Sequence, residues 1–262
     1  MKVKGVCHVL SRYSYDGKHT LEELRELFTA RGISFALMSE HTDHLTPESA
    51  ELFLRECEAL SDSDFLFIPG FEVPYLGNHV LALAASRYPS SFDASEMLKE
   101  FHAQGALLVL AHPHRNNFKT DTFLKNNLLG IEVWNSQYDG IHAPRSQAMQ
   151  LFRGLGKEER YAFGSIDLHR SEHVGGPCLI SEIPVLQREA VVESIRDGAY
   201  VISRGPVTVN SRGEVLEGNP FLISIAGYLL PGIISALKKI SSFFAIVGIK
   251  KLPLKSTIRA KL

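Results

Sequence analysis

Residues 106–115, ALLVLAHPHR, begin with six consecutive apolar residues and then reach a histidine, His112. Strands that are buried on both faces typically read as such continuous apolar runs. Pro113 ends the run, because proline has no backbone N–H to donate to a sheet. An apolar run that ends at a histidine or an acid recurs along the chain up to about residue 203, and this recurrence decides the fold that we expect.

Short apolar runs alternate with amphipathic segments over the same part of the chain. The candidate strands are residues 3–9, 34–39, 65–70, 79–84, 106–111, 130–134, 161–164 and 178–183. The segments between them carry helix signals, such as Thr20 followed by Glu23, and Thr46 followed by Pro47. The candidate helices are residues 20–32, 46–60, 93–105, 143–154 and 188–198. Repeated strand–helix units favour a parallel sheet with helices around it.

Polar residues at the strand ends distinguish two forms of such a sheet. These residues are His8, Glu40, His41, Glu72, His112, Asp167 and His169. In a barrel the carboxyl ends of the strands converge on one mouth, whereas an open doubly wound sheet would spread the same residues along an edge. Their positions therefore favour an α/β fold in which the sheet is a closed or distorted barrel.

The composition fits a packed protein and argues against several other classes. The 262 residues suffice for one large α/β domain or two modest ones. A net charge of -1 gives no sign of a basic surface, so we expect no stable binding of nucleic acid. The three scattered cysteines form no CxxC pair, which is typical of reduced thiols in a cytoplasmic protein. The first nine residues, MKVKGVCHV, contain no apolar run long enough for a signal peptide.

Six short motifs occur in a fixed order, each associated with an apolar strand. They are His8 with residues 13–17 (YSYDG), then 39–41 (SEH), 70–72 (GFE), 111–113 (AHP), 131–133 (IEV) and 167–169 (DLH). In this order they resemble the polymerase and histidinol phosphatase (PHP) family over about residues 3–205. The resemblance implies a distorted (β/α)7 TIM-like barrel that binds two or three Zn, Mn or Fe ions and usually acts on phosphate esters.

The resemblance also implies a set of metal ligands. They are His8, Asp16, His41, Glu72, His112, Asp167 and His169. Imidazole and carboxylate groups suit Zn, Mn and Fe. Glu72 is expected to bridge two ions, while Glu40 and Glu132 are expected to orient ligating histidines without touching the metal. Without this context, Asp16 before Gly17 would equally indicate a simple turn.

Further residues are candidates for catalysis and substrate binding. Besides Glu72, His169 and His79 are candidate catalytic residues, because a histidine is suited to protonate the leaving oxygen. His169 cannot do this while it is a ligand, and His79 equally fits a ligand, a substrate contact or a structural residue. The candidate substrate-binding residues are Arg115 and Arg170 for phosphate oxygens, and Asn135 as an oxygen donor to substrate or metal.

Leu10 departs from the family pattern, which has a second histidine at that position. Side chains two residues apart on a strand share a face, so Leu10 removes a nitrogen ligand from the first ion. Three outcomes follow: the first ion persists with His8, Glu72, Asp167 and water, the site uses the other ions, or catalysis is impaired. The many polar residues that remain favour an active or partly active phosphoesterase with a small-molecule or nucleotide phosphoester as substrate.

The chain changes character after about residue 217. Residues 199–215 predict a short β appendage, with turns at 204–206 and 210–213, that completes a domain over 1–217. Residues 218–262 contain no acid and end in a basic segment. The uncharged run 221–237 is marginal for a membrane span, because glycine and proline interrupt it.

Three interpretations of this apolar, amphipathic tail stay open. From residue 230 onward, apolar residues recur at helical spacing, at Leu230, Ile233, Leu237, Ile240, Phe244 and Val247. The tail is a helix docked on the barrel, a basic amphipathic helix that contacts a membrane through residues 221–252, or a span. The second interpretation places a cytoplasmic protein at the inner face of the membrane.

Other catalytic schemes have less support. The sequence contains no Gly-x-Ser-x-Gly elbow, no GxxxxGK[ST] loop and no GxGxxG loop. One rival class is a non-catalytic metal- or phosphate-binding module. Another is a metal-dependent hydrolase of the amidohydrolase type, against which the lack of a strand-end lysine among the expected ligands argues. The oligomeric state does not follow from the sequence.

Overall fold

The computed structural model describes residues 1–140, 142–156 and 160–246. Within this part the chain forms seven α-helices: α1 (Leu21–Thr29), α2 (Pro47–Ala59), α3 (Ala94–Ala103), α4 (Thr122–Asn127), α5 (Ser146–Gly154), α6 (Arg188–Arg196) and α7 (Pro220–Ile246). Three short 3-10 helices, η1 (Thr42–His44), η2 (Pro113–Asn116) and η3 (Ser171–His173), follow strand ends. All five predicted helices are present, and α4 is an additional helix that the sequence pattern did not indicate.

The strands of the described residues form two sheets. One has the order β13-β12-β11-β10-β1-β2-β4 and the other has the order β3-β5-β6-β7-β8-β9. Their bounds are β1 (Lys2–Val9), β2 (Phe35–Met38), β3 (Glu40–His41), β4 (Leu66–Ile68), β5 (Gly70–Tyr75), β6 (Asn78–Leu83), β7 (Leu107–Ala111), β8 (Gly130–Asn135), β9 (Tyr161–Ser165), β10 (Cys178–Glu182), β11 (Tyr200–Arg204), β12 (Val207–Asn210) and β13 (Val215–Glu217). The mixed α/β class that the sequence predicts is confirmed, and all eight predicted strands are present.

The expected barrel is not closed by hydrogen bonds among the described residues, because two separate sheets take its place. The sheets nevertheless meet along the segment that follows β9. The N–H groups of Ile166 and Leu168 donate to Cys7 and His8 of β1, each at 3.0 Å, and the N–H of Leu10 donates back to Leu168 at 3.0 Å. The carboxyl end of β1 therefore lies beside the segment after β9, as it would in a distorted barrel.

A β-hairpin explains part of the departure from a parallel sheet. Strands β5 and β6 are antiparallel, with Tyr75 opposite Asn78 across a two-residue loop. Both loop residues, Leu76 and Gly77, have positive φ angles of 48° and 77°, as in the tight turn that suits the twist of paired strands. We expected Glu72 just after a strand, but it lies within β5. Strand β5 pairs with β6, which carries His79.

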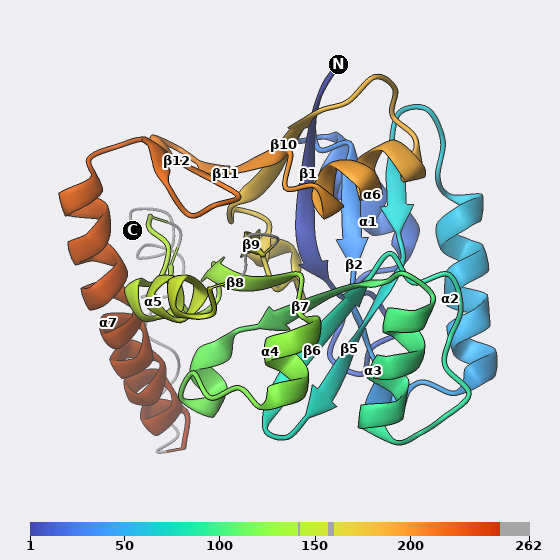
Figure 1. The fold of residues 1–262 in the computed structure, drawn as a ribbon, viewed down its shortest axis with the longest axis horizontal. Coiled ribbons are helices and arrows are strands. Elements are labelled where there is room, and N and C mark those ends of the chain that lie inside the picture. Colours follow the sequence, from blue (N-terminus) through green and yellow to red (C-terminus); the bar gives the residue numbers. More distant parts are fainter. Residues whose placement is uncertain (141, 157–159, 247–262) are drawn as a thin grey trace.

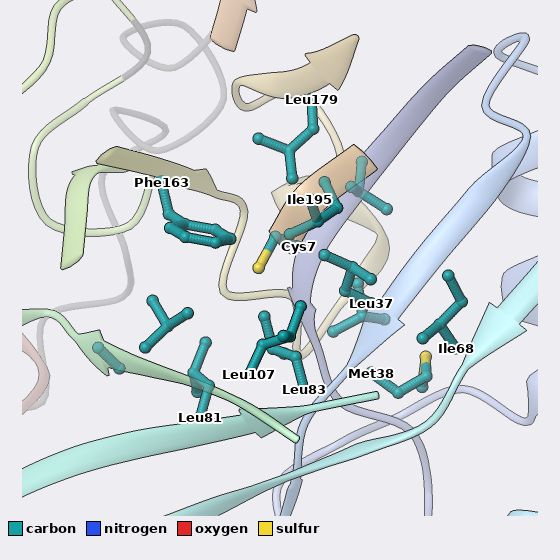
Figure 2. Close-up of a cluster of buried hydrophobic side chains, with 14 of the residues drawn as sticks. Cys7, Leu37, Met38, Ile68, Leu81, Leu83, Leu107, Phe163, Leu179 and Ile195 are labelled. Atoms are coloured by element: carbon teal, nitrogen blue, oxygen red, sulfur yellow. The ribbon is translucent and has the colours of Figure 1, made fainter. Parts of the chain in front are cut away.

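The two sheets enclose a common hydrophobic core. Figure 2 shows Cys7 and Leu37 from the first sheet pointing toward the same interior as Leu81 and Phe163 from the second. Helices cover the outside of this core, with α2 and α3 beside the ends of β4 and β5 (Figure 1). Most strand residues are apolar and buried, and the buried acids Glu72 in β5 and Glu132 in β8 are exceptions within strands.

The capping residues behave as the sequence indicates. Thr20 and Glu23 form a reciprocal capping box at the start of α1, and Thr46 caps α2 with Pro47 in its first turn. Asp93 accepts from the backbone of the first turn of α3. These contacts satisfy N–H groups that a helix start otherwise leaves without partners.

Strands β11 to β13 are not a separate appendage, because β11 pairs with β10 and so extends the first sheet. Helix α7 begins three residues after β13 and continues through Pro231. It lies along one side of the molecule, next to α5 (Figure 1). Its segment Pro220–Leu237 is long and apolar enough to cross a membrane, with a mean hydropathy of 1.8. Residues 247–262, which include Val247 and the end of the expected contact segment 221–252, lie outside the described residues.

Candidate metal centre

The carboxylate of Glu72 lies among four histidines. Its Oε2 is 3.0 Å from Nε2 of His8 and 3.5 Å from Nδ1 of His41. Its Oε1 is 3.2 Å from Nε2 of His112 and also contacts Nδ1 of His79. Glu72 is only 1% exposed. Burial would raise its pKa, but the imidazoles, with His8 foremost, hold the pKa of this carboxyl well below its usual value.

Three of the site residues have an unusual backbone conformation that sets the direction of their side chains. His8 lies at a bulge of β1, where the register against β2 shifts between Cys7 and Val9. His8, His112 and Asp167 have φ angles of 64°, 27° and 46°, in a region that residues other than glycine rarely adopt. Such conformations persist where the surrounding structure enforces them, and they concentrate at functional sites.

The ligand-type atoms form three overlapping groups of three, in each of which the atoms lie within 4.8 Å of one another. The groups are His8 with Glu72 and His112, His41 with Glu72 and His79, and Asp16 with His41 and His169. Glu72 belongs to two groups and His41 to two. The arrangement therefore resembles a chain of adjoining cation sites more than one isolated site.

Glu132 holds His8 and His112 from behind. Its Oε1 lies 2.7 Å from Nδ1 of His8, and its Oε2 accepts the backbone N–H of His112 at 2.7 Å. Burial opposes its ionisation, yet His8 and the other partners lower its pKa to about 2. With Nδ1 occupied in this way, Nε2 of His8 faces Glu72, which is the kind of indirect support expected around ligating histidines.

Asn135 lies beneath the site instead of on a substrate surface. Its Nδ2 donates to Glu132 at 3.1 Å and to Asp167 at 3.2 Å, while its Oδ1 accepts the N–H of Gln137 at 2.9 Å. The side chain is buried. The oxygen that we expected to offer to substrate or metal is thus engaged with the backbone, and the amide joins two acids of the site.

Asp167 and His169 contact the cluster from the segment after β9. Oδ1 of Asp167 is 3.6 Å from Nε2 of His8 and 3.4 Å from Nδ1 of His169. The same Nδ1 of His169 is 3.0 Å from the carbonyl oxygen of Asp167, so Nε2 faces Asp16 at 2.9 Å. The segment therefore joins the His8 group to the Asp16 group.

The pair of His41 and His169 holds Asp16 at the more open end of the cluster. Oδ1 of Asp16 is 3.5 Å from Nε2 of His41. Burial opposes the charged forms of all three groups, but their mutual attraction prevails: the pKa of Asp16 is lowered, and the pKa values of His41 and His169 are raised. Without the context of the motif set, the same Asp-Gly sequence would have indicated only a turn.

Glu40 does not contact a histidine side chain among the described residues, contrary to its expected orienting role. Its buried carboxylate accepts the N–H of Ser11 at 2.8 Å and the hydroxyl of Ser14 at 2.5 Å. The same Ser14 oxygen accepts the N–H of His41 at 2.9 Å. Burial raises the pKa of Glu40. Glu40 therefore fixes the loop that carries Asp16.

The remaining predicted residues lie at the rim. His79 contacts Glu72 and keeps part of its ring exposed. Arg115, in η2, and Arg170, just before η3, are exposed, and neither guanidinium donates a hydrogen bond within the described part of the chain. Both are free to meet an anion, but the structure does not draw either of them into the histidine cluster.

Aromatic residues at the rim were missed by the sequence reasoning. The exposed ring of Tyr15 stacks on His41, with 5.1 Å between centroids. The ring of Tyr138 lies 4.4 Å from that of His114. Burial, together with Arg145, lowers the pKa of His114 to about 3. The only sequence signal for these rings was their closeness to predicted metal ligands: Tyr15 precedes Asp16, and His114 follows His112 by two residues.

Leu10 is fully buried but does not belong to the main hydrophobic core. It offers no ligand atom next to His8. His8 nevertheless keeps Glu72, Glu132 and Asp167 within 3.6 Å of its ring nitrogens. The position of the family's second histidine is thus taken by a buried leucine, two residues after His8.

Comparisons with known proteins support the fold. No protein-family model matches the sequence, and no curated protein matches it. Among solved structures, the chain is similar to a two-domain protein from Bacteroides vulgatus that contains a predicted PHP-like metal-dependent phosphoesterase. The TM-score is 0.63 at 18% identity, over 80% of this chain and 67% of that one.

Two further structures are similar over most of this chain. PsfC from Pseudomonas syringae has a TM-score of 0.55 at 13% identity, over 90% of this chain and 99% of PsfC. A lesion-specific endonuclease from Pyrococcus furiosus has a TM-score of 0.54 at 17% identity, over 80% of this chain. This chain spans 59% of the endonuclease's length.

The fold and the site together define a class: a mixed α/β protein with a histidine and carboxylate cluster where its strands end. Within that class, the structural neighbours include a PHP-like metal-dependent phosphoesterase. The resemblance that the sequence motifs indicate is therefore confirmed at the level of the fold.

Proposed function

We propose that this protein is a metal-dependent phosphoesterase that hydrolyses a small-molecule or nucleotide phosphate ester with an activated water. The observation that carries the proposal is the position of Glu72, a buried carboxylate in contact with four imidazoles. A hydrophobic interior does not otherwise retain so many ionisable groups, because each is costly to bury. The net charge of -1 favours a small substrate over a long nucleic acid.

The residues present fit two or three divalent ions such as Zn, Mn or Fe. The three overlapping groups supply imidazole nitrogens and carboxylate oxygens, the donors that these ions prefer. Two buried polar atoms, Nδ1 of His112 and Oδ1 of Asp16, have no hydrogen-bond partner within the described part of the chain. We assign the ligands His8, Asp16, His41, Glu72, His112, Asp167 and His169, with His79 beside them.

Bound divalent ions supply positive charge that lowers the pKa of water and offsets charge on the phosphoryl oxygens. The protein's own residues prepare this chemistry. Glu132 fixes the ring of His8, and the carbonyl of Asp167 fixes the ring of His169. We assign the binding of phosphoryl oxygens, which suit the planar guanidinium group, to the exposed Arg115 and Arg170.

Of the two histidine candidates we take His79 as the general acid, and we therefore leave it out of the assigned ligands although it lies in the group of His41 and Glu72. Both ring nitrogens of His169 are engaged, one with Asp167 and one with Asp16. His79 turns Nδ1 to Glu72 and is partly exposed, which leaves Nε2 to hold a proton for the leaving oxygen. The exposed ring of Tyr15 stacks on His41, whose ring lies 6.2 Å from that of His79 between centroids, and we assign Tyr15 as a surface for an apolar leaving group.

A second candidate is a catalytically impaired module that still binds metal or phosphate. Leu10 favours it, because the residue removes one ligand beside His8.

We place the protein in the cytoplasm, since its three cysteines are all unpaired and buried.

Hydrolysis of an aryl phosphate by the purified protein in the presence of Mn²⁺ tests the proposal. We expect turnover that Glu72→Gln reduces at least about 100-fold, because the variant removes the charge that the ligand groups share. Glu58→Gln, on the exposed face of α2, is the matched control and should retain full activity. Metal binding without hydrolysis would instead support the impaired module, and neither metal binding nor hydrolysis would refute both.

A further inference from the structure

One face of α7 is built to rest on the rest of the protein. Ile223, Gly227 and Pro231 are buried on that face. The Oγ of Ser146, at the start of α5, donates to the carbonyl oxygen of Ser224 at 2.9 Å. A Cβ atom at Gly227 would lie 2.1 Å from the carbonyl oxygen of Pro144, so only glycine allows this approach.

The opposite face of α7 is apolar and exposed. Its large residues are between 41% and 71% exposed: Phe221, Leu222, Ile225, Tyr228, Leu229 and Ile233. At 3.6 residues per turn these positions fall on one side of the helix. Only 17% of the segment Pro220–Leu237 is buried, so the helix is not a core helix. Soluble proteins rarely leave a continuous apolar surface of this kind uncovered.

Charge indicates what covers this face. Residues 218–262 contain seven lysine or arginine residues and no acid. Lys239 is exposed near the C-terminal end of α7, and by helical spacing it lies on the same side as Phe221 and Tyr228. A helix with a large apolar face and nearby basic residues is typical of proteins that lie in the interface of an anionic bilayer.

We propose that this face of α7 binds the surface of an anionic phospholipid bilayer, with the helix parallel to the membrane and its other face still docked on α5. A second copy of the chain is a less favourable occupant, because in a two-fold contact the same surface meets itself, and residues 218–262 carry no acid to pair with their seven basic residues. A spanning helix would have to give up the contacts of Ser224 and Gly227. The proposal does not depend on the metal centre.

Co-sedimentation of the full-length chain with vesicles tests this proposal. The probe is a vesicle of phosphatidylcholine with about one third phosphatidylserine, compared with phosphatidylcholine alone and with high salt. The variant Phe221→Asp/Leu222→Glu places charges on the exposed face. Its matched control is Phe92→Asp/Leu52→Glu, which alters an equally exposed phenylalanine and leucine away from α7.

We expect the wild-type chain and the control to bind the anionic vesicles and the α7 variant to bind at least about tenfold more weakly, since apolar burial drives insertion. Binding should fall in high salt or without phosphatidylserine. The proposal is overturned if the wild type does not sediment with anionic vesicles, or if the two double variants bind alike. A dimer in solution that only the α7 variant dissociates, without vesicle binding, would identify a second copy as the occupant and also overturn it. A circular dichroism spectrum and a melting temperature that match those of the wild type would show that the α7 variant is folded.

Discussion

His8, His112 and Asp167, three of the proposed metal ligands, each have a positive φ angle. Such a backbone conformation costs on the order of 1–3 kcal/mol for a residue other than glycine. The surrounding contacts hold it in place: the N–H of His112 is held by Glu132, and the carbonyl of His8 accepts the N–H of Leu168. At the scale of single residues, strained backbone conformations therefore help to direct side chains toward Glu72.

Leu10→His should strengthen the cluster at its weakest point. The new imidazole would enter a buried position near His8, where Glu72 and Asp167 supply negative charge. We expect metal affinity to rise by at least about tenfold, as is typical for changes around a metal ligand, and phosphatase activity to rise with it. Isothermal titration with Mn²⁺ measures the first and an aryl phosphate assay the second. Leu10→Met is the control for packing, and equal affinities for the two variants would contradict the prediction.

Protons and metal ions compete for the cluster. In the metal-free protein the pKa values of His8, His41 and His169 are raised, because neighbouring carboxylates outweigh the effect of burial. Histidines with a raised pKa stabilise the fold fully below their unfolded pKa, about 6.5, and this stabilisation is lost as the pH rises through the folded pKa. Metal binding needs the neutral rings, so the ions take over as the protons leave.

The stabilisation that metal gives should therefore increase with pH. We expect the difference in melting temperature between Mn²⁺-loaded and chelator-treated protein to be larger at about pH 8 than at about pH 6. Because the two forms are compared at the same pH, the contributions of titrating groups that lie away from the site cancel in this difference. A difference that is equal at both pH values, or larger at the lower one, would be inconsistent with histidine ligands.

At the scale of structural elements, the loop after β1 is organised by one serine. Ser14 donates to Glu40 and accepts from the N–H of His41, and Asp16 follows two residues later. Ser14→Ala leaves a buried carboxylate with one donor fewer, which costs about 1–3 kcal/mol. We expect a lower melting temperature and weaker binding of one ion. Ser63→Ala, at an exposed loop position, is the control, and identical behaviour of the two variants would argue against this role of the loop.

Replacing either of two glycines of α7 by alanine should change the stability of the helix, in opposite directions at the two positions. At Gly227 the added Cβ would meet the backbone oxygen of Pro144, whereas at Gly232 it would meet no described atom within 4 Å beyond its chain neighbours and the backbone of its own helix. Gly227→Ala should undock the helix and destabilise it by about 1–3 kcal/mol, while Gly232→Ala should stabilise it by up to about 1 kcal/mol. Hydrogen exchange of residues 220–237 compares them, and faster exchange in both variants, or in neither, would contradict the docked helix.

Regular elements were predictable where local signals agree. Continuous apolar runs located all eight predicted strands, and Thr20 and Thr46 located the starts of α1 and α2. Strand β5 was missed because Glu72 and Pro74 interrupt its apolar pattern. The partners of that strand lie on β6 and β3, so its pairing depends on contacts that no local pattern encodes.

The whole molecule brings the site together from most of its strands. The sequence motifs identified the residues that surround Glu72, but they did not predict which of these residues contact one another. The contacts of Glu40 and Asn135 were not predictable, since each finds its partners through the tertiary fold: Glu40 holds Ser11 and Ser14, and Asn135 joins Glu132 to Asp167. Likewise, two sheets that meet along residues 166–168 replace the expected closed barrel, because strand pairing is set by the whole chain.

The central claim is that the cluster around Glu72 binds metal, and metal analysis after equilibrium dialysis tests it most directly. The wild-type chain, dialysed against Mn²⁺ or Zn²⁺ and analysed by mass spectrometry, should retain about two to three ions per molecule. Glu72→Gln should retain about one or none, because two of the three ligand groups share this carboxylate. Fewer than about one ion in the wild type, or the same number in both proteins, would contradict the account.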